Sequence, residues 1–188
     1  MKDVIKILPL LGLYILIVLL ASTNAFQGDE EKYVLLAKNL SKGFYSSLTE
    51  INLWNGPGYP IILLPFVGLK MPLITAKLLN AVFLLLAMAY FYKALQLYIS
   101  KRHALYFTYI MGLYPPMLAH LNLLITESFV FFLVCGFLFH FFKLHNNGGD
   151  KRIHFIMAAC YLGYFLLTKI YYSYIFLATI LLAALLYF

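Results

Sequence analysis

Charged residues are scarce in this sequence: Asp, Glu, Lys and Arg make up 11% of its 188 positions, whereas 64% are hydrophobic. A soluble domain carries roughly 25% charged residues, and a water-soluble fold cannot hide so much apolar surface. The composition therefore predicts a membrane protein. The net charge of +7 does not indicate a nucleic-acid partner, because most of the bases lie between long apolar runs, where membrane topology explains them.

Cysteine and the common catalytic motifs are also lacking. Cys135 and Cys160 lie inside apolar runs with no CxxC pattern, so we interpret both as packing residues. There is no GxSxG, Walker, GxGxxG or HExxH motif, and the five histidines are scattered over different segments. Nucleotide-driven chemistry in the cytoplasm is therefore not indicated.

Six apolar runs approach the length of about 20 residues that a helix needs to cross a bilayer. They cover residues 4–21, 72–98, 104–119, 121–142, 153–168 and 171–188. We predict an all-α, polytopic membrane protein in which residues 1–188 form a single transmembrane domain. The first run also fits a signal peptide, because small residues follow it at 21–25, but its length favours an uncleaved span.

The positions of the bases predict the orientation of these spans. Lysines and arginines fall on alternate ends of successive runs, and such ends face the cytoplasm. The bases concerned are Lys2, Lys6, Lys93, Lys101, Arg102, Lys143, Lys151 and Arg152. The N-terminus is thus expected in the cytoplasm, and residues 22–71, the turn near 120–122 and the joint at 169–170 on the far side.

The extracytoplasmic loop 22–71 is predicted to carry two helices close to the membrane. Residues 29–40 form an amphipathic pattern, with one apolar face at spacings of three and four, typical of a helix on the membrane surface. Residues 58–69 are apolar but short, and they contain Pro60 and Pro65. A half-inserted or surface helix fits this segment better than a span.

Three polar places lie on the predicted outer side, and each has two interpretations. Asp29, Glu30 and Glu31 follow the first span, either as acid–base groups or as ordinary charges at a helix start. Glu127 begins the fourth span, either as a functional carboxylate or as a side chain that reaches the headgroups. Lys169 lies among tyrosines, where it either pairs with a lipid phosphate or marks the membrane interface.

Short motifs in this sequence resemble, in order and sidedness, the N-terminal half of the GT-C membrane glycosyltransferases. The likeness is to the dolichyl-phosphate-mannose mannosyltransferase-like and aminoarabinose-transferase-like branch. The motifs are Asp29-Glu30 with Tyr33 and Ala37, Gly56-Pro57-Gly58-Tyr59-Pro60, Ala76-Lys77-Leu78-Leu79-Asn80, Tyr114-Pro115, Thr126-Glu127-Ser128 and Leu167-Thr168-Lys169. We expect the chain to be the N-terminal part of such a module, which has further spans.

The resemblance implies a function and assigns roles to five residues. The family uses a polyprenyl-phosphate-linked sugar as donor and works at the extracytoplasmic face, here of the bacterial plasma membrane, on a lipid, glycan or protein acceptor. Asp29 would be the catalytic carboxylate, and Glu30, Tyr59, Glu127 and Lys169 would bind substrate. No cofactor is certain, and a divalent metal is compatible with the site.

Two other classes of protein compete with the enzyme. A transporter or lipid flippase would place polar residues at mid-membrane in broken helices, and the apolar runs contain few such residues away from their ends. A non-catalytic membrane scaffold is the other class, which the expected truncation of the module keeps open.

Overall fold

The computed structural model describes residues 4–23, 25–47, 51, 54–146 and 150–187. Within these residues the chain forms helices and no strand, so the predicted all-helical class is confirmed. A 3₁₀ turn, η1, covers Val4–Ile7 and leads into α1. The helices are α1 (Leu8–Ala21), α2 (Glu30–Leu40), α3 (Gly58–Gly68), α4 (Leu73–Leu95), α5 (Lys101–Gly112), α6 (Pro115–Ala119), α7 (Glu127–His145), α8 (Lys151–Thr168) and α9 (Ile170–Tyr187).

Two of these helices, α4 and α7, are long and apolar enough to cross a membrane, judged by length and composition. Three shorter apolar helices accompany them, over Ile5–Ala21, Gly58–Gly68 and Ile170–Ala184. The membrane character predicted from composition is therefore supported for two segments.

Two predicted runs differ from the observed helices. The run 104–119 is not one helix, because α5 ends at Gly112 and α6 starts at Pro115. Proline has no N–H and disfavours a helical residue before it, and Tyr114 is accordingly extended, with φ −64° and ψ 117°. The run 121–142 becomes helical only at Glu127. Upstream of it, backbone groups of residues 121–124 bond to side chains of α2 and α4.

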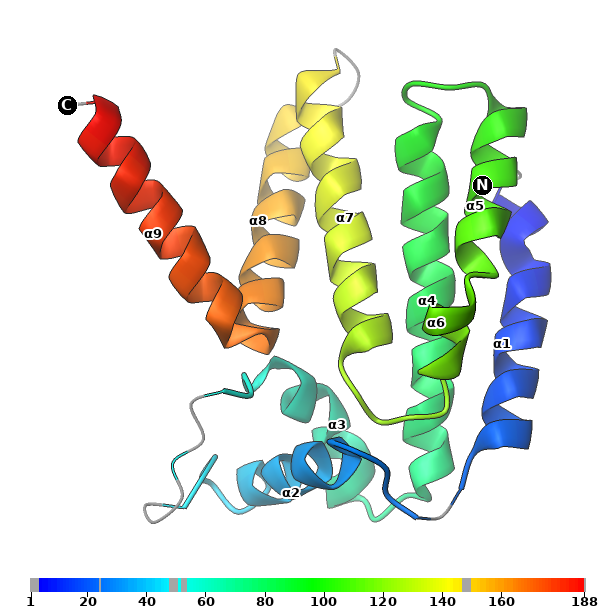
Figure 1. Cartoon of the computed structure of the whole chain (residues 1–188), viewed down its shortest axis with the longest axis vertical. Helices are drawn as coiled ribbons and strands as arrows, with labels where there is room; N and C mark the ends of the chain where they lie inside the picture. Colours follow the sequence, from blue (N-terminus) through cyan, green and yellow to red (C-terminus); the bar gives the residue numbers. More distant parts are fainter. Residues whose placement is uncertain (1–3, 24, 48–50, 52–53, 147–149, 188) are drawn as a thin grey trace.

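The bundle is arranged around α4, which packs against α1, α5 and α7, while α8 packs on α7 (Figure 1). Helices α2 and α3 lie across one end of these upright helices, and α9 leans away from α8 (Figure 1). The ends of α4 and α7 and the starts of α5, α8 and η1 lie at the opposite end (Figure 1). The bases predicted to face the cytoplasm, on η1, α4, α5, α7 and α8, therefore share one end of the bundle. The three polar places, at residues 29–31, 127 and 169, share the other.

The main core joins α1, α4 and α5. Tyr14 is fully buried, and its hydroxyl donates to the carbonyl of Gly112 at 2.9 Å, which ties α1 to the end of α5. Gly112 allows this approach, because a Cβ there would lie 2.8 Å from both Leu10 Cδ1 and the Tyr14 hydroxyl. Leu84 and Met88 of α4 complete the centre of this core, and both are fully buried.

A second core lies under α2 and α3. The apolar face of α2 is buried as its periodicity predicts, with Tyr33 and Ala37 packed against Tyr59 and Leu63 of α3. The opposite face of α2, which carries Lys38, is exposed. The partner of the amphipathic face is thus another helix of the same chain, and this contact fixes α2 at the end of the bundle.

Candidate functional site

The five residues singled out from the sequence lie at the α2/α3 end of the bundle. Asp29 and Glu30 begin α2, Tyr59 lies in the first turn of α3, Glu127 begins α7, and Lys169 separates α8 from α9. These elements meet below the upright helices (Figure 1). Segments more than 100 residues apart in the sequence therefore contribute to one region.

Asp29 and Glu30 are adjacent in sequence but have opposite environments. Gly28 has a φ of +57°, the left-handed region that glycine adopts readily, and it turns the chain into α2. Asp29 occupies the N-cap position, is exposed, and makes no side-chain hydrogen bond to the helix. Glu30 is fully buried, with 0% of its surface exposed. Only Asp29 therefore presents its carboxylate to the surroundings.

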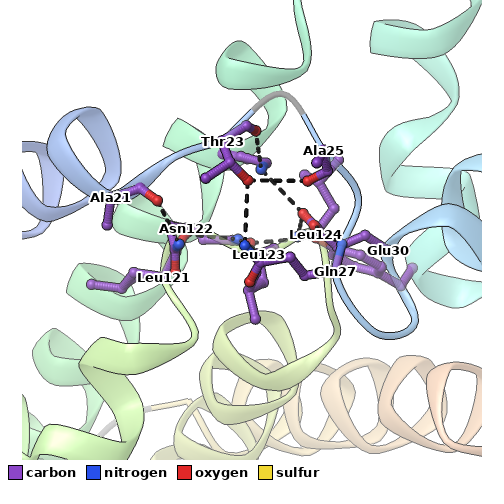
Figure 2. A network of polar contacts seen from close by, with 12 residues as sticks. Ala21, Thr23, Ala25, Gln27, Glu30, Leu121, Asn122, Leu123 and Leu124 are labelled. Atoms are coloured by element: carbon purple, nitrogen blue, oxygen red, sulfur yellow. Dashed lines mark hydrogen bonds and ion pairs between the residues drawn. The ribbon is translucent and has the colours of Figure 1, made fainter.

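The Glu30 carboxylate is held by partners from three different segments. Lys77 Nζ of α4 lies 3.2 Å from Oε1 and is itself only 3% exposed. The backbone N–H of Leu124 donates to Oε1 at 2.8 Å, and that of Gln27 donates to Oε2 at 2.8 Å. Figure 2 shows Gln27, Glu30 and Leu124 converging beside the connection from α1. Both carboxylate oxygens are thus engaged.

Further hydrogen bonds continue this network along α4 and the 121–124 segment. Lys77 Nζ also donates to the carbonyl of Thr23 at 3.2 Å. Asn80, one turn further along α4, donates from Nδ2 to the carbonyls of Leu123 at 2.6 Å and Leu121 at 3.2 Å. Asn122 Nδ2 donates to the carbonyl of Ala21 at 2.9 Å, which closes the network at the end of α1 (Figure 2).

Glu127 and Lys169 form a looser pair. Their closest atoms, Oε1 and Nζ, are 3.9 Å apart, and the Glu127 and Lys169 side chains are 42% and 20% exposed. Glu127 Oε2 has no hydrogen-bond partner among the residues that the structure describes. A partly exposed ion pair at this distance contributes little to stability, so neither charge is held tightly by the other.

Tyr33 feels the charges of both Glu127 and Asp29. Burial raises the pKa of its hydroxyl above the ordinary tyrosine value, contacts with Asn55 and Thr126 partly offset this, and the charges of Glu127 and Asp29 raise it further. The hydroxyl therefore stays protonated near neutral pH and lies within the field of both carboxylates. The sequence marked Tyr33 as a buried position of α2 but did not reveal that both acids influence its hydroxyl.

Tyr59 serves as a packing centre for the same region. Its ring meets that of Tyr33 edge to face, with centroids 5.4 Å apart, and its hydroxyl lies 3.4 Å from Asn80 Oδ1. Burial raises the pKa of Tyr59 as well. Tyr59 itself is 1% exposed, so its ring packs inside the protein against α2. The substrate contact predicted for it stays a prediction.

The Gly56-Pro57-Gly58 segment brings α3 against the end of α8. A Cβ at Gly56 would collide with the Leu167 carbonyl oxygen, and one at Gly58 would collide with Thr168 Oγ1 and lie 2.9 Å from Thr168 Cα. The Tyr164 hydroxyl donates to the carbonyl of Gly58 at 3.1 Å. The two glycines thereby allow the chain to approach the residues that directly precede Lys169.

Two residues that the sequence did not single out as functional, Lys77 and Asn80, prove central to the arrangement. The signal was present, because a lysine and an asparagine three residues apart lie on one face of an otherwise apolar helix. Such polar groups need buried partners. The identity of those partners could not be read from the sequence, since they come from residues 23, 30, 121 and 123.

Within the described ranges no group of three or more His, Cys, Asp or Glu side chains is arranged to hold a metal ion. The divalent metal that the family resemblance allows therefore has no assigned ligands. Comparison of the chain with protein-family models, with curated proteins and with solved structures finds no match.

Proposed function

We propose that this chain is part of a membrane glycosyltransferase that transfers a sugar from a polyprenyl-phosphate donor to an acceptor at the extracytoplasmic face of a bacterial plasma membrane. The observation that carries the proposal is the Glu127–Lys169 pair at the same end of the apolar helix bundle as the exposed Asp29. An exposed carboxylate and a weakly paired cation at one end of the bundle suit the removal of a proton and the binding of a phosphate.

The membrane arrangement belongs to the same proposal. Six spans, with the N-terminus in the cytoplasm, would put the basic connections on the cytoplasmic side and the α2/α3 end outside. Large apolar side chains remain exposed on α8 and α9, as surfaces that face lipid require. They include Ile153, Phe155, Ile156, Ile175 and Leu181.

In the proposed reaction Asp29 acts as the general base. It accepts the proton of the acceptor hydroxyl while that oxygen attacks the anomeric carbon of the sugar. The bond between this carbon and the phosphate oxygen breaks, the polyprenyl phosphate leaves with the electron pair, and the configuration inverts. Lys169 stabilises the departing phosphate. Its pairing with Glu127 at 3.9 Å is weak enough for a phosphate oxygen to replace the carboxylate.

The test compares Asp29→Asn with Glu31→Gln in the protein expressed from its complete reading frame. Membranes are supplied with a panel of polyprenyl-phosphate hexoses and pentoses, and release of polyprenyl phosphate is followed. Asp29→Asn keeps the size of the side chain but removes its basicity, so transfer should fall by ~10²-fold or more. Glu31 is exposed about 200° around α2 from Asp29, at ~100° per residue, and Glu31→Gln should stay active.

Two results would refute the assignment. Normal transfer by Asp29→Asn would remove Asp29 as the base. Failure of the unaltered protein to use any donor of the panel would favour a transporter or a scaffold instead.

A further inference from the structure

The buried pair of Glu30 and Lys77 has a cost that its contribution to stability does not explain. Desolvation of two charges is expensive, and apolar residues of similar volume often replace a buried ion pair without loss of stability. A fully buried glutamate, paired with a lysine that is 3% exposed, therefore indicates a requirement for a specific arrangement.

The contacts of Glu30 identify the segments that are arranged. Oε2 accepts from the N–H of Gln27, two residues before Asp29, and Oε1 accepts from the N–H of Leu124, three residues before Glu127. Lys77 anchors the carboxylate to α4 and also binds the Thr23 carbonyl. The Glu30 side chain thus connects the backbone just before Asp29 to the backbone just before Glu127.

We infer that Glu30 and Lys77 are positioning residues, a buried brace that sets the distance between Asp29 and the Glu127–Lys169 pair, and that Glu30 does not contact the substrate. The inference rests on the proposed function for its catalytic consequence. It revises the substrate-binding role that the family resemblance implies for Glu30, because both of its oxygens are occupied inside the protein. Asp29 alone of the two adjacent acids remains open to a ligand.

The brace can be removed without leaving an unpaired buried charge. The double variant Glu30→Met/Lys77→Met replaces the ion pair by two apolar side chains of similar length, so the bundle should still fold, with a thermal midpoint lowered by the unpaired amides. The amides of Gln27 and Leu124 then lose their acceptor. Their hydrogen exchange, measured by NMR in detergent micelles, should accelerate by at least ~10-fold, while amides in the middle of α4 and α7 keep their protection.

In the transfer assay the same variant should lower kcat by at least ~10-fold and leave the KM for the donor nearly unchanged. Misplaced catalytic groups reduce the rate in this way. A contact between Glu30 and the donor would give the opposite pattern, a raised KM with unchanged exchange at Gln27 and Leu124, and that result would overturn the inference. The matched control is Glu31→Met, an apolar substitution at the exposed position next to Glu30. It should change neither the hydrogen exchange at Gln27 and Leu124 nor kcat.

Two provisions keep the result decisive. If the double variant does not fold, Glu30→Gln takes its place: its amide keeps one acceptor oxygen, so only one of the two backbone amides should stay protected. The exchange measurement needs no substrate. If exchange accelerates in the variant but the unaltered protein transfers no sugar, the brace is retained and the glycosyltransferase is rejected. If exchange is unchanged in the variant and the unaltered protein is active, only the brace is rejected.

Discussion

Replacing Gly58 by alanine should destabilise the protein. The loss should exceed that from alanine at any described glycine outside residues 56–58. The new Cβ would collide with Thr168 Oγ1 and lie 2.9 Å and 3.0 Å from the Cα and N atoms of Thr168. Two of these atoms belong to the backbone, so rotation of one side chain cannot relieve the overlap. Either α3 moves away from the end of α8 or both segments deform.

The magnitude follows from the cost of overpacking, about 1–3 kcal/mol for an added methyl group in a close-packed site. For a chain of this size each kcal/mol corresponds to roughly 2–4 °C in the thermal midpoint. Gly163→Ala is the matched control, because Gly163 lies in α8 with no atom within 4 Å of its ideal Cβ. Alanine there should stabilise the helix by about 0.5–1 kcal/mol.

Thermal unfolding of the two variants in detergent micelles, followed by circular dichroism at 222 nm, measures both effects. Adding Thr168→Ala to Gly58→Ala removes the hydroxyl overlap but leaves the backbone contacts, so only part of the loss should be recovered, as a double-mutant cycle can quantify. A Gly58→Ala protein as stable as Gly163→Ala would show that α3 and α8 do not approach as closely as described.

Three further results are expected. In a cysteine-free background, Lys42→Cys should react with a membrane-impermeant maleimide in intact spheroplasts and Lys151→Cys only after permeabilisation, and labelling of both from one side would contradict the proposed topology. Tyr14→Phe should lower the free energy of unfolding by about 1 kcal/mol, because the Gly112 carbonyl loses its buried donor, and an unchanged midpoint would disprove that role. Lys169→Ala should weaken use of the lipid donor far more than Lys169→Arg, whereas near-normal activity of both would make Lys169 an interface anchor.

Local pattern was sufficient for the helical class and for several individual elements. The burial of Tyr33 and Ala37 on one face of α2 follows from the helical period of 3.6 residues, because such an apolar face can pack against any neighbouring apolar surface. The short helix α3 begins at Gly58 and ends at Gly68, close to the predicted 58–69. The break before α6 was also readable in principle, because Pro115 restricts the residue before it, although the apolar run alone suggested a continuous span.

The candidate site was only partly accessible to the same reasoning. The sequence put Asp29, Glu127 and Lys169 at the same predicted side of the membrane through the alternation of bases, and in the structure they lie at one end of the bundle. It could not distinguish Asp29 from Glu30, since both are acids at a helix start. Their environments differ because Glu30 meets Lys77 and Leu124, and the latter lies 94 residues away.

The sequence by itself thus determined the helical class, which faces of the helices are apolar and at which ends the charges lie, because these depend on residues a few positions apart. Only the tertiary structure decided which polar groups are consumed inside the protein and which stay free. The start of α7 at Glu127 shows the reason: the backbone of residues 121–124 bonds to Glu30 and Asn80 rather than to its own helix. Such partners are set by the packing of distant segments, and no local pattern contains them.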